Sequence, residues 1–223
     1  MKRIKEQFLD KLELVVPLKN KLVLEVGSGD GSRSEATALL ARHLTGIEPD
    51  QGKIDTARSR NINNATFLRG EAQSLPFEIS HFDVTIFALS FHHVPFDLMA
   101  TAIDEAIRVT KKKGLIVFLE PGTKGSFFEA EIKFGLFDGD ETEAKAKAYE
   151  TMMHHRGLRL FQEIPDETIF QSDDFKETLW IETAKVAPNS IGHFIHEHNY
   201  TLVAERRINI FQPVRSPDYR AAT

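Results

Sequence analysis

The chain of 223 residues contains no cysteine. That absence excludes disulfide bonds, a thiolate nucleophile and cysteine-ligated zinc. Basic residues are not in excess either, because 28 Lys and Arg stand against 33 Asp and Glu, which gives a net charge of −5. A nucleic-acid-binding protein needs a basic surface to displace the counterions of the phosphates, so the composition disfavours nucleic acid as a partner.

Long apolar runs are also missing from the sequence. No run approaches the ~18–20 residues that a membrane-spanning helix needs. The charged residues 1–6 lack the apolar stretch of a secretory signal, so we expect a cytoplasmic protein with no membrane partner. What the sequence does contain is 41% hydrophobic residues, enough for a large buried core, in a length that favours one domain.

Short apolar strands alternate with helical patterns through the first half of the chain. We expect strands at 21–26, 44–47, 65–68, 82–89 and 115–119, and helices at 32–43, 51–60 and 97–110. Two of these strands are almost continuously apolar, which is typical of a parallel sheet buried on both faces. The predicted fold class is therefore α/β, a doubly wound, mostly parallel Rossmann-like sheet with helices on both faces. Ligands of such sheets bind at the carboxyl ends of the strands.

A glycine-rich segment, Gly27-Ser28-Gly29-Asp30-Gly31, follows the strand at 21–26 and precedes a helix. Glycine adopts positive φ and lets the backbone approach a ligand closely, while the start of a helix offers free N–H groups. The strand before the turn and the helix after it favour a nucleotide-type ligand over an ordinary tight turn.

Three further strands end in polar side chains at the same predicted edge of the sheet. Glu48 can accept the hydroxyl hydrogens of a ribose, and Glu71 can accept from an adenine amino group. His92 and His93 follow the fourth strand with Phe91, at the expected mouth of the site, where histidine can act as a general base near neutral pH. Taken singly, each of these residues could equally be an ordinary surface or packing residue.

The order and spacing of these segments resemble the class I S-adenosylmethionine-dependent methyltransferases of the small-molecule type. The resemblance extends over residues 20–121 and rests on the segments 23–31, 46–50, 70–77, 82–94 and 105–114. It implies an enzyme that transfers the methyl group of S-adenosylmethionine to a small-molecule acceptor. The chain departs from the family at Glu71, where Asp is usual, and at Lys113-Gly114, where the family has two glycines.

The resemblance also implies which residues act. The implied cofactor-binding residues are Glu25, Gly27, Ser28, Gly29, Glu48, Glu71, Ala72 and Leu89. Glu25 would anchor the amino group of the methionine half, Glu48 the ribose, and Glu71 the adenine. If the reaction uses a base, His92 or His93 is the candidate, and we hypothesise that Glu120 also faces the acceptor.

The rest of the chain is assigned around this core. We expect a single domain over 1–223, with an N-terminal helix in 1–19, the cofactor-binding core in 20–121, and helices that cap the substrate in 122–199. Those helices are expected at 126–137, 140–156 (with Gly157 as C-cap), 172–187 and after Pro188. A strand in 200–212 is expected to close the sheet edge.

Other interpretations stay open at this point. His193 and His196 are spaced for one helix face, but no carboxylate is clearly paired with them, so we expect no metal site. A nicotinamide-dependent oxidoreductase uses a similar sheet, although its Gly-x-Gly-x-x-Gly fingerprint differs from the glycines here. A non-catalytic S-adenosylmethionine-binding module is the second alternative. The sequence leaves the oligomeric state open, a homodimer included.

Overall fold

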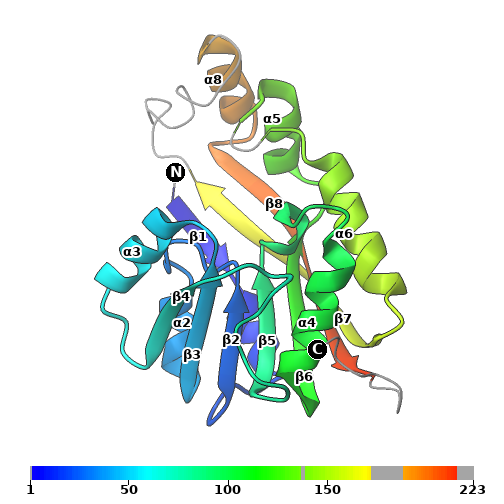
Figure 1. The fold of residues 1–223 in the computed structure, drawn as a ribbon. Helices are drawn as coiled ribbons and strands as arrows, with labels where there is room; N and C mark the ends of the chain where they lie inside the picture. The colour runs from blue at the N-terminus through cyan, green and yellow to red at the C-terminus, as the bar shows by residue number, and fades with distance from the viewer. Residues whose placement is uncertain (1, 137–138, 172–187, 215–223) are drawn as a thin grey trace.

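The computed structural model describes residues 2–136, 139–171 and 188–214. Eight strands form one sheet in the order β1-β7-β8-β6-β5-β2-β3-β4 (Figure 1). The strands are β1 (Lys2–Glu6), β2 (Leu22–Val26), β3 (His43–Glu48), β4 (Ala65–Arg69), β5 (Phe82–Ala88), β6 (Thr110–Pro121), β7 (Leu158–Gln171) and β8 (Thr201–Pro213). The helices are α1 (Phe8–Glu13), α2 (Ser34–Leu40), α3 (Gln51–Ser59), the 3-10 helix η1 (Phe91–His93), α4 (Met99–Val109), α5 (Ser126–Phe134), α6 (Thr142–His154) and α8 (Pro188–Glu197).

The five strands β4, β3, β2, β5 and β6 pair in parallel, as the sequence predicts. Their side chains alternate between two buried layers. Val84 and Val117 pack with α1 on one face, and Phe87 and Phe118 pack with α4 and α6 on the other. The strands β3, β2 and β5 and the later part of β6 are buried on both faces, which confirms the doubly wound α/β class and explains their apolar runs.

The remaining three strands run antiparallel and extend the sheet beyond β6. β8 pairs with β6, β7 with β8, and β1 with β7. The prediction that the strand at 200–212 closes the sheet edge is therefore wrong, because β1 is the edge strand. The sequence analysis misses β7, whose first part is largely exposed and carries no apolar run.

The predicted helix at the N-terminus is wrong over its first residues. Lys2–Glu6 forms β1, because β7 offers it hydrogen-bonding partners from Gln171 to Thr168. Only α1 remains helical, and its Phe8 and Leu12 are buried in the core. Pairing with a distant strand here overrides the helical spacing of the local sequence.

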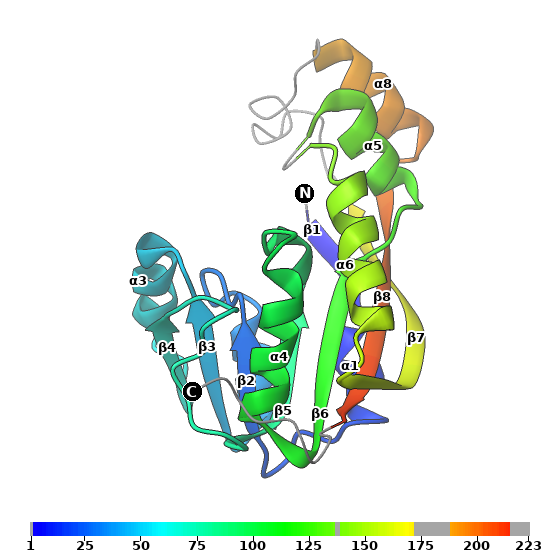
Figure 2. The same cartoon turned by 45° about the vertical axis from the view of Figure 1, so that its right-hand side comes forward.

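The helices after β6 stand at the carboxyl end of that strand. Figure 2 shows α5 and α8 beyond the sheet and α6 running down beside it. Phe127, Phe134 and Phe194 join α5 and α8 in a separate small core. Gly135 is the C-cap of α5 in the left-handed conformation (φ 61°), whereas the C-cap of α6 is His155 and not the predicted Gly157. The predicted helix at 172–187 lies outside the described residues.

None of the helices in the described ranges is long and apolar enough to cross a membrane.

Candidate functional site

A cavity of about 490 Å³ opens at the carboxyl ends of β2, β3, β4 and β5. Its volume lies within the ~300–1,000 Å³ typical of small-molecule sites. Seven of the residues predicted from the sequence line it: Gly27, Gly29, Glu48, Glu71, Ala72, Leu89 and His93. The fold therefore brings most of the predicted site to one place, and Lys53 and Ser90 are wall residues that the sequence analysis did not single out.

The glycine turn is shaped by its neighbours. Gly27 has φ 77°, and a Cβ atom there would collide with Ser90, whose hydroxyl donates to the Val26 carbonyl at 2.6 Å. Gly29 has φ 55°, but a Cβ atom on it would meet nothing within 4 Å. The backbone N–H groups of Gly27 and Ser28 both donate to the Ile47 carbonyl, which ties the turn to β3. The turn is thus closely packed at Gly27 and open at Gly29.

The Glu48 carboxylate is buried and fixed by the backbone. One oxygen accepts from the Gly29 N–H at 3.0 Å, and the other accepts from the Asp50 N–H at 3.1 Å. A carboxylate oxygen can accept two hydrogen bonds, so each oxygen keeps capacity for one more. Two neighbouring hydroxyl groups of a ligand in the cavity could use that capacity.

Two predicted cofactor residues do not line this cavity. The Ser28 side chain is buried against Gly46, so close that a Cβ atom on Gly46 would lie 2.8 Å from it. Glu25 lines a neighbouring cavity of about 330 Å³ together with Arg33, and accepts a 2.5 Å hydrogen bond from the Ser34 hydroxyl. Burial outweighs that hydrogen bond and raises the pKa of Glu25 to about 7.

The two histidines differ in environment. His92 is buried, with its Nδ1 2.5 Å from Glu120 Oε2, while His93 is half exposed and lines the cavity. The other Glu120 oxygen accepts from the Phe91 N–H at 3.0 Å. Burial alone would lower the pKa of His92, but the charge and hydrogen bond of Glu120 raise it above its usual value.

Phe91 does not lie at the mouth of the site as predicted. It is fully buried and packs against Phe87 and Phe118, with ring centroids 5.4 and 4.9 Å away. The apolar ring is therefore part of the core that supports the histidines.

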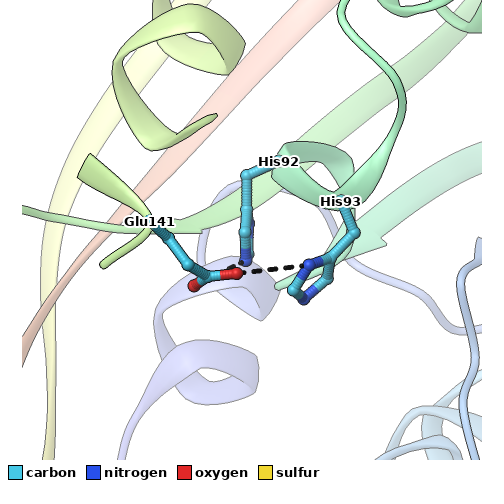
Figure 3. Close-up of side chains that lie close together, drawn as sticks. All are labelled: His92, His93 and Glu141. Atoms are coloured by element: carbon cyan, nitrogen blue, oxygen red, sulfur yellow. Dashed lines mark ion pairs between the residues drawn. The ribbon is translucent and has the colours of Figure 1, made fainter. Parts of the chain in front are cut away.

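Glu141, at the start of α6, is a site residue that the sequence analysis misses. Its carboxylate lies 3.4 Å from His93 Nδ1 and 3.7 Å from His92 Nε2 (Figure 3). The Lys145 ammonium lies 3.6 Å from Glu141 and 3.1 Å from Glu131. No local motif could have indicated Glu141, because its contact with η1 depends entirely on how α6 packs.

His193, weighed as a metal ligand from its spacing, lies on the surface. It is 76% exposed and pairs with Glu197 at 3.2 Å. In the part of the chain that the structure describes, His193 and His196 belong to no group of side chains spaced to bind a metal ion.

Comparison with known proteins shows similarity to methyltransferases. Residues 24–118 match the family described as "Methyltransferase domain". A demethylmenaquinone methyltransferase from Thermotoga maritima is 30% identical over 143 residues, which cover 58% of this chain and 61% of that protein. A fatty-acid O-methyltransferase from Mycolicibacterium smegmatis is 35% identical over 95 residues, which cover 41% of this chain and 35% of that protein.

The fold is shared over a longer stretch than the sequence. A structure from Bacillus halodurans described as a methyltransferase aligns with a TM-score of 0.65 and 17% identity, covering 93% of this chain and 99% of that one. The chain spans less than two thirds of the length of the curated relatives named here. These matches support the resemblance drawn from the sequence, because residues 24–118 match a methyltransferase domain and the chain shares its fold with a structure described as a methyltransferase.

Proposed function

We propose that the chain transfers the methyl group of S-adenosylmethionine to a small organic acceptor. The observation that carries the proposal is the Glu48 carboxylate, held by Gly29 and Asp50 at the wall of the cavity. Relatives named for a demethylmenaquinone and for a fatty acid support an acceptor of small-molecule size.

The residues of the cavity fit the cofactor. Glu48 is proposed to bind the ribose hydroxyls, and Glu71 and Ala72, which follow β4, are proposed to bind the adenine. Glu48 and Glu71 also make this wall acidic, which suits a ligand that carries a sulfonium and an ammonium.

The glycine turn is proposed to receive the methionine half. The N–H groups of Gly27, Ser28 and Gly29 donate to Ile47 and Glu48, and the Ser28 carbonyl accepts from the Gly31 N–H at 3.1 Å. The carbonyl oxygens of Gly27 and Gly29 are therefore proposed to accept from the ammonium. Leu89 lines the same cavity and has a left-handed backbone (φ 57°). Its backbone is proposed to contact the methionine half of the cofactor. Glu25 is proposed to strengthen the attraction for the ammonium from behind the turn.

The histidines are proposed to act on the acceptor. S-adenosylmethionine supplies a methyl group with a thioether leaving group, so the protein chiefly has to hold the acceptor in line with that methyl. His93 reaches the cavity directly, and His92 lies behind it, fixed by Glu120. We propose a single domain over 1–223, in which the core at 20–121 binds the cofactor and the elements from 122 to 199 cover the acceptor.

The test is a turnover assay. The purified chain is incubated with S-adenosylmethionine and a panel of phenols, carboxylic acids, hydroquinones and amines, and S-adenosylhomocysteine is measured by mass spectrometry. We expect turnover with at least one acceptor class and its loss in Glu48→Ala, but not in Glu78→Ala, whose exposed side chain lies off the cavity. Cofactor binding without turnover on any acceptor would instead support a non-catalytic binding module.

A further inference from the structure

Three potential metal ligands converge beside the cavity, at the wall that His93 forms. His92 and His93 from η1 and Glu141 from the start of α6 each offer one ligand atom, and these atoms lie within 4.8 Å of one another (Figure 3). We propose that His92, His93 and Glu141 bind a divalent transition-metal cation. Binding of the cation does not depend on the proposed function, whereas its role toward a methyl acceptor rests on it.

The orientation of His92 is the first argument. Its Nδ1–H donates to Glu120, which is itself held by the Phe91 N–H, so Nε2 is the nitrogen directed toward Glu141. With Nδ1 carrying the proton, the Nε2 of a neutral His92 presents a lone pair toward the Glu141 carboxylate, and either a second proton or a bound cation can lie between the two. A carboxylate that fixes the tautomer and orientation of a ligating histidine is the usual outer-shell partner in metal sites.

The spacing of the ligand atoms is the second argument. Metal–nitrogen bonds of ~2.0–2.1 Å in a tetrahedral zinc site place neighbouring ligand atoms ~3.4 Å apart. Glu141 Oε1 lies 3.4 Å from His93 Nδ1, and Glu141 Oε2 lies 3.7 Å from His92 Nε2. One ligand atom from each of the three residues lies within 4.8 Å of the others, so small rotations of Glu141 and of the half-exposed His93 would bring the three atoms to the spacing of a metal site.

The balance of charge is the third argument. Lys145 lies nearest to Glu131, at 3.1 Å, so those two charges compensate each other. Glu120 and Glu141 remain as two carboxylates beside the two imidazoles. The Glu120 side chain is almost fully buried, and the Glu141 side chain is largely buried. Metal ligation requires both imidazoles to be neutral, and in that state the two negative charges match one divalent cation.

The ligand set also defines the kind of metal and its use. Two imidazoles and one carboxylate suit zinc, manganese, cobalt or ferrous iron more than calcium or magnesium. Three protein ligands leave a coordination position open. Because His93 lines the cavity, that position is accessible to an oxygen atom of the acceptor, so the site favours acceptors that carry a hydroxyl or carboxyl group.

The test is direct metal binding by the full chain after treatment with a chelator. We expect one equivalent of Co²⁺ to give a ligand-field absorption band, and Zn²⁺ to bind competitively in calorimetry. His93→Asn and Glu141→Gln should weaken binding by more than the ~10–100-fold that loss of an outer-shell partner costs, and Glu120→Gln should fall within that range. His193→Asn and Glu143→Gln, which alter exposed residues of α8 and α6, should bind like the unmodified chain.

Two results would overturn the site. One is binding by the unmodified chain that is no tighter than by the double variant His93→Asn/Glu141→Gln, and the other is a cobalt band that persists in that variant. Circular dichroism checks that each variant is folded. His93→Asn alters only a half-exposed side chain, so metal binding by this variant tests the site even if Glu141→Gln unfolds. A stoichiometric site without any methyl transfer would leave the metal proposal standing and count against the proposed function. Turnover that needs no metal would support the proposed function and would overturn the role of the metal toward the acceptor.

Discussion

The two ends of the cavity are built in different ways. At the proposed cofactor end, the candidate residues follow consecutive strands, and the Glu48 carboxylate is held by backbone N–H groups of Gly29 and Asp50. At the proposed acceptor end, His92 Nδ1 contacts Glu120 from β6, and its Nε2 faces Glu141 at the start of α6. The first end is therefore specified by short motifs, whereas the second exists only once distant elements have packed together.

The largest expected effect is on the cofactor end alone. Glu48→Ala removes a buried carboxylate proposed to form two charge-assisted hydrogen bonds to the ribose, each worth about 1.5–3 kcal/mol. We expect the affinity for S-adenosylhomocysteine, measured by calorimetry, to fall at least ~100-fold. Glu48→Gln keeps one oxygen acceptor, so its affinity should lie between those of the unmodified chain and Glu48→Ala. Equal affinities in these three proteins would contradict the assignment of Glu48.

The second prediction compares two glycines of the same turn. Gly27→Ala combines the ~1–2 kcal/mol cost of a left-handed non-glycine residue with a collision against Ser90 worth ~1–3 kcal/mol. We expect it to lower the free energy of unfolding by about 2–5 kcal/mol, against about 1–2 kcal/mol for Gly29→Ala, which meets no atom within 4 Å. Urea denaturation measures both variants, and Ser90→Gly in the Gly27→Ala background should restore part of the loss. Equal destabilisation by the two alanines would refute the packing argument.

The third prediction separates the two ends functionally. Glu120→Gln can still accept from the Phe91 N–H but no longer holds His92 with a charge, so it should act on the acceptor end only. We expect kcat to fall ~10–100-fold, while the affinity for S-adenosylhomocysteine stays within about twofold. A matched loss of cofactor affinity would show that the two ends are not independent.

The smallest expected effect concerns pH. The pKa of Glu25 is about 7 in the free protein because burial disfavours its charge, whereas a cofactor ammonium favours the charged form. Below pH 7 the ligand must displace a proton, so its affinity should rise as pH increases, by about tenfold between pH 6 and pH 8. Calorimetry with S-adenosylhomocysteine measures this slope, and Glu25→Gln should abolish it. A slope that survives in the variant would have to come from another group.

The same contrast explains what could be predicted from the sequence. The parallel strands and the loops after them were predictable because buried strands show as apolar runs and the cofactor motifs are local. β7 was not, because a long strand that is exposed over its first part and paired mostly with β8 carries no apolar run of its own. β1 was predicted as a helix because residues 2–6 share helical spacing with α1, and only the pairing with β7 makes them a strand.

In the candidate site, too, the residues that follow parallel strands were predictable and those that depend on packing were not. Gly27, Gly29, Glu48, Glu71, Ala72, Leu89 and His93 are residues whose proximity follows from parallel strand order alone, and they line one cavity. Phe91 was misplaced because its side chain turns into the core while its neighbour His93 turns outward, and the sequence pattern does not resolve that alternation. Glu141 was missed because a residue at the start of a distant helix has no positional relation to η1 until α6 packs against it.

The central claim is that the cavity at the glycine turn is an S-adenosylmethionine site. Calorimetric titration of the purified chain with S-adenosylmethionine and, separately, with NADH tests it most directly. We predict saturable binding of one equivalent of S-adenosylmethionine and no binding of NADH. The absence of S-adenosylmethionine binding, or NADH binding that Glu48→Ala abolishes, would contradict the account.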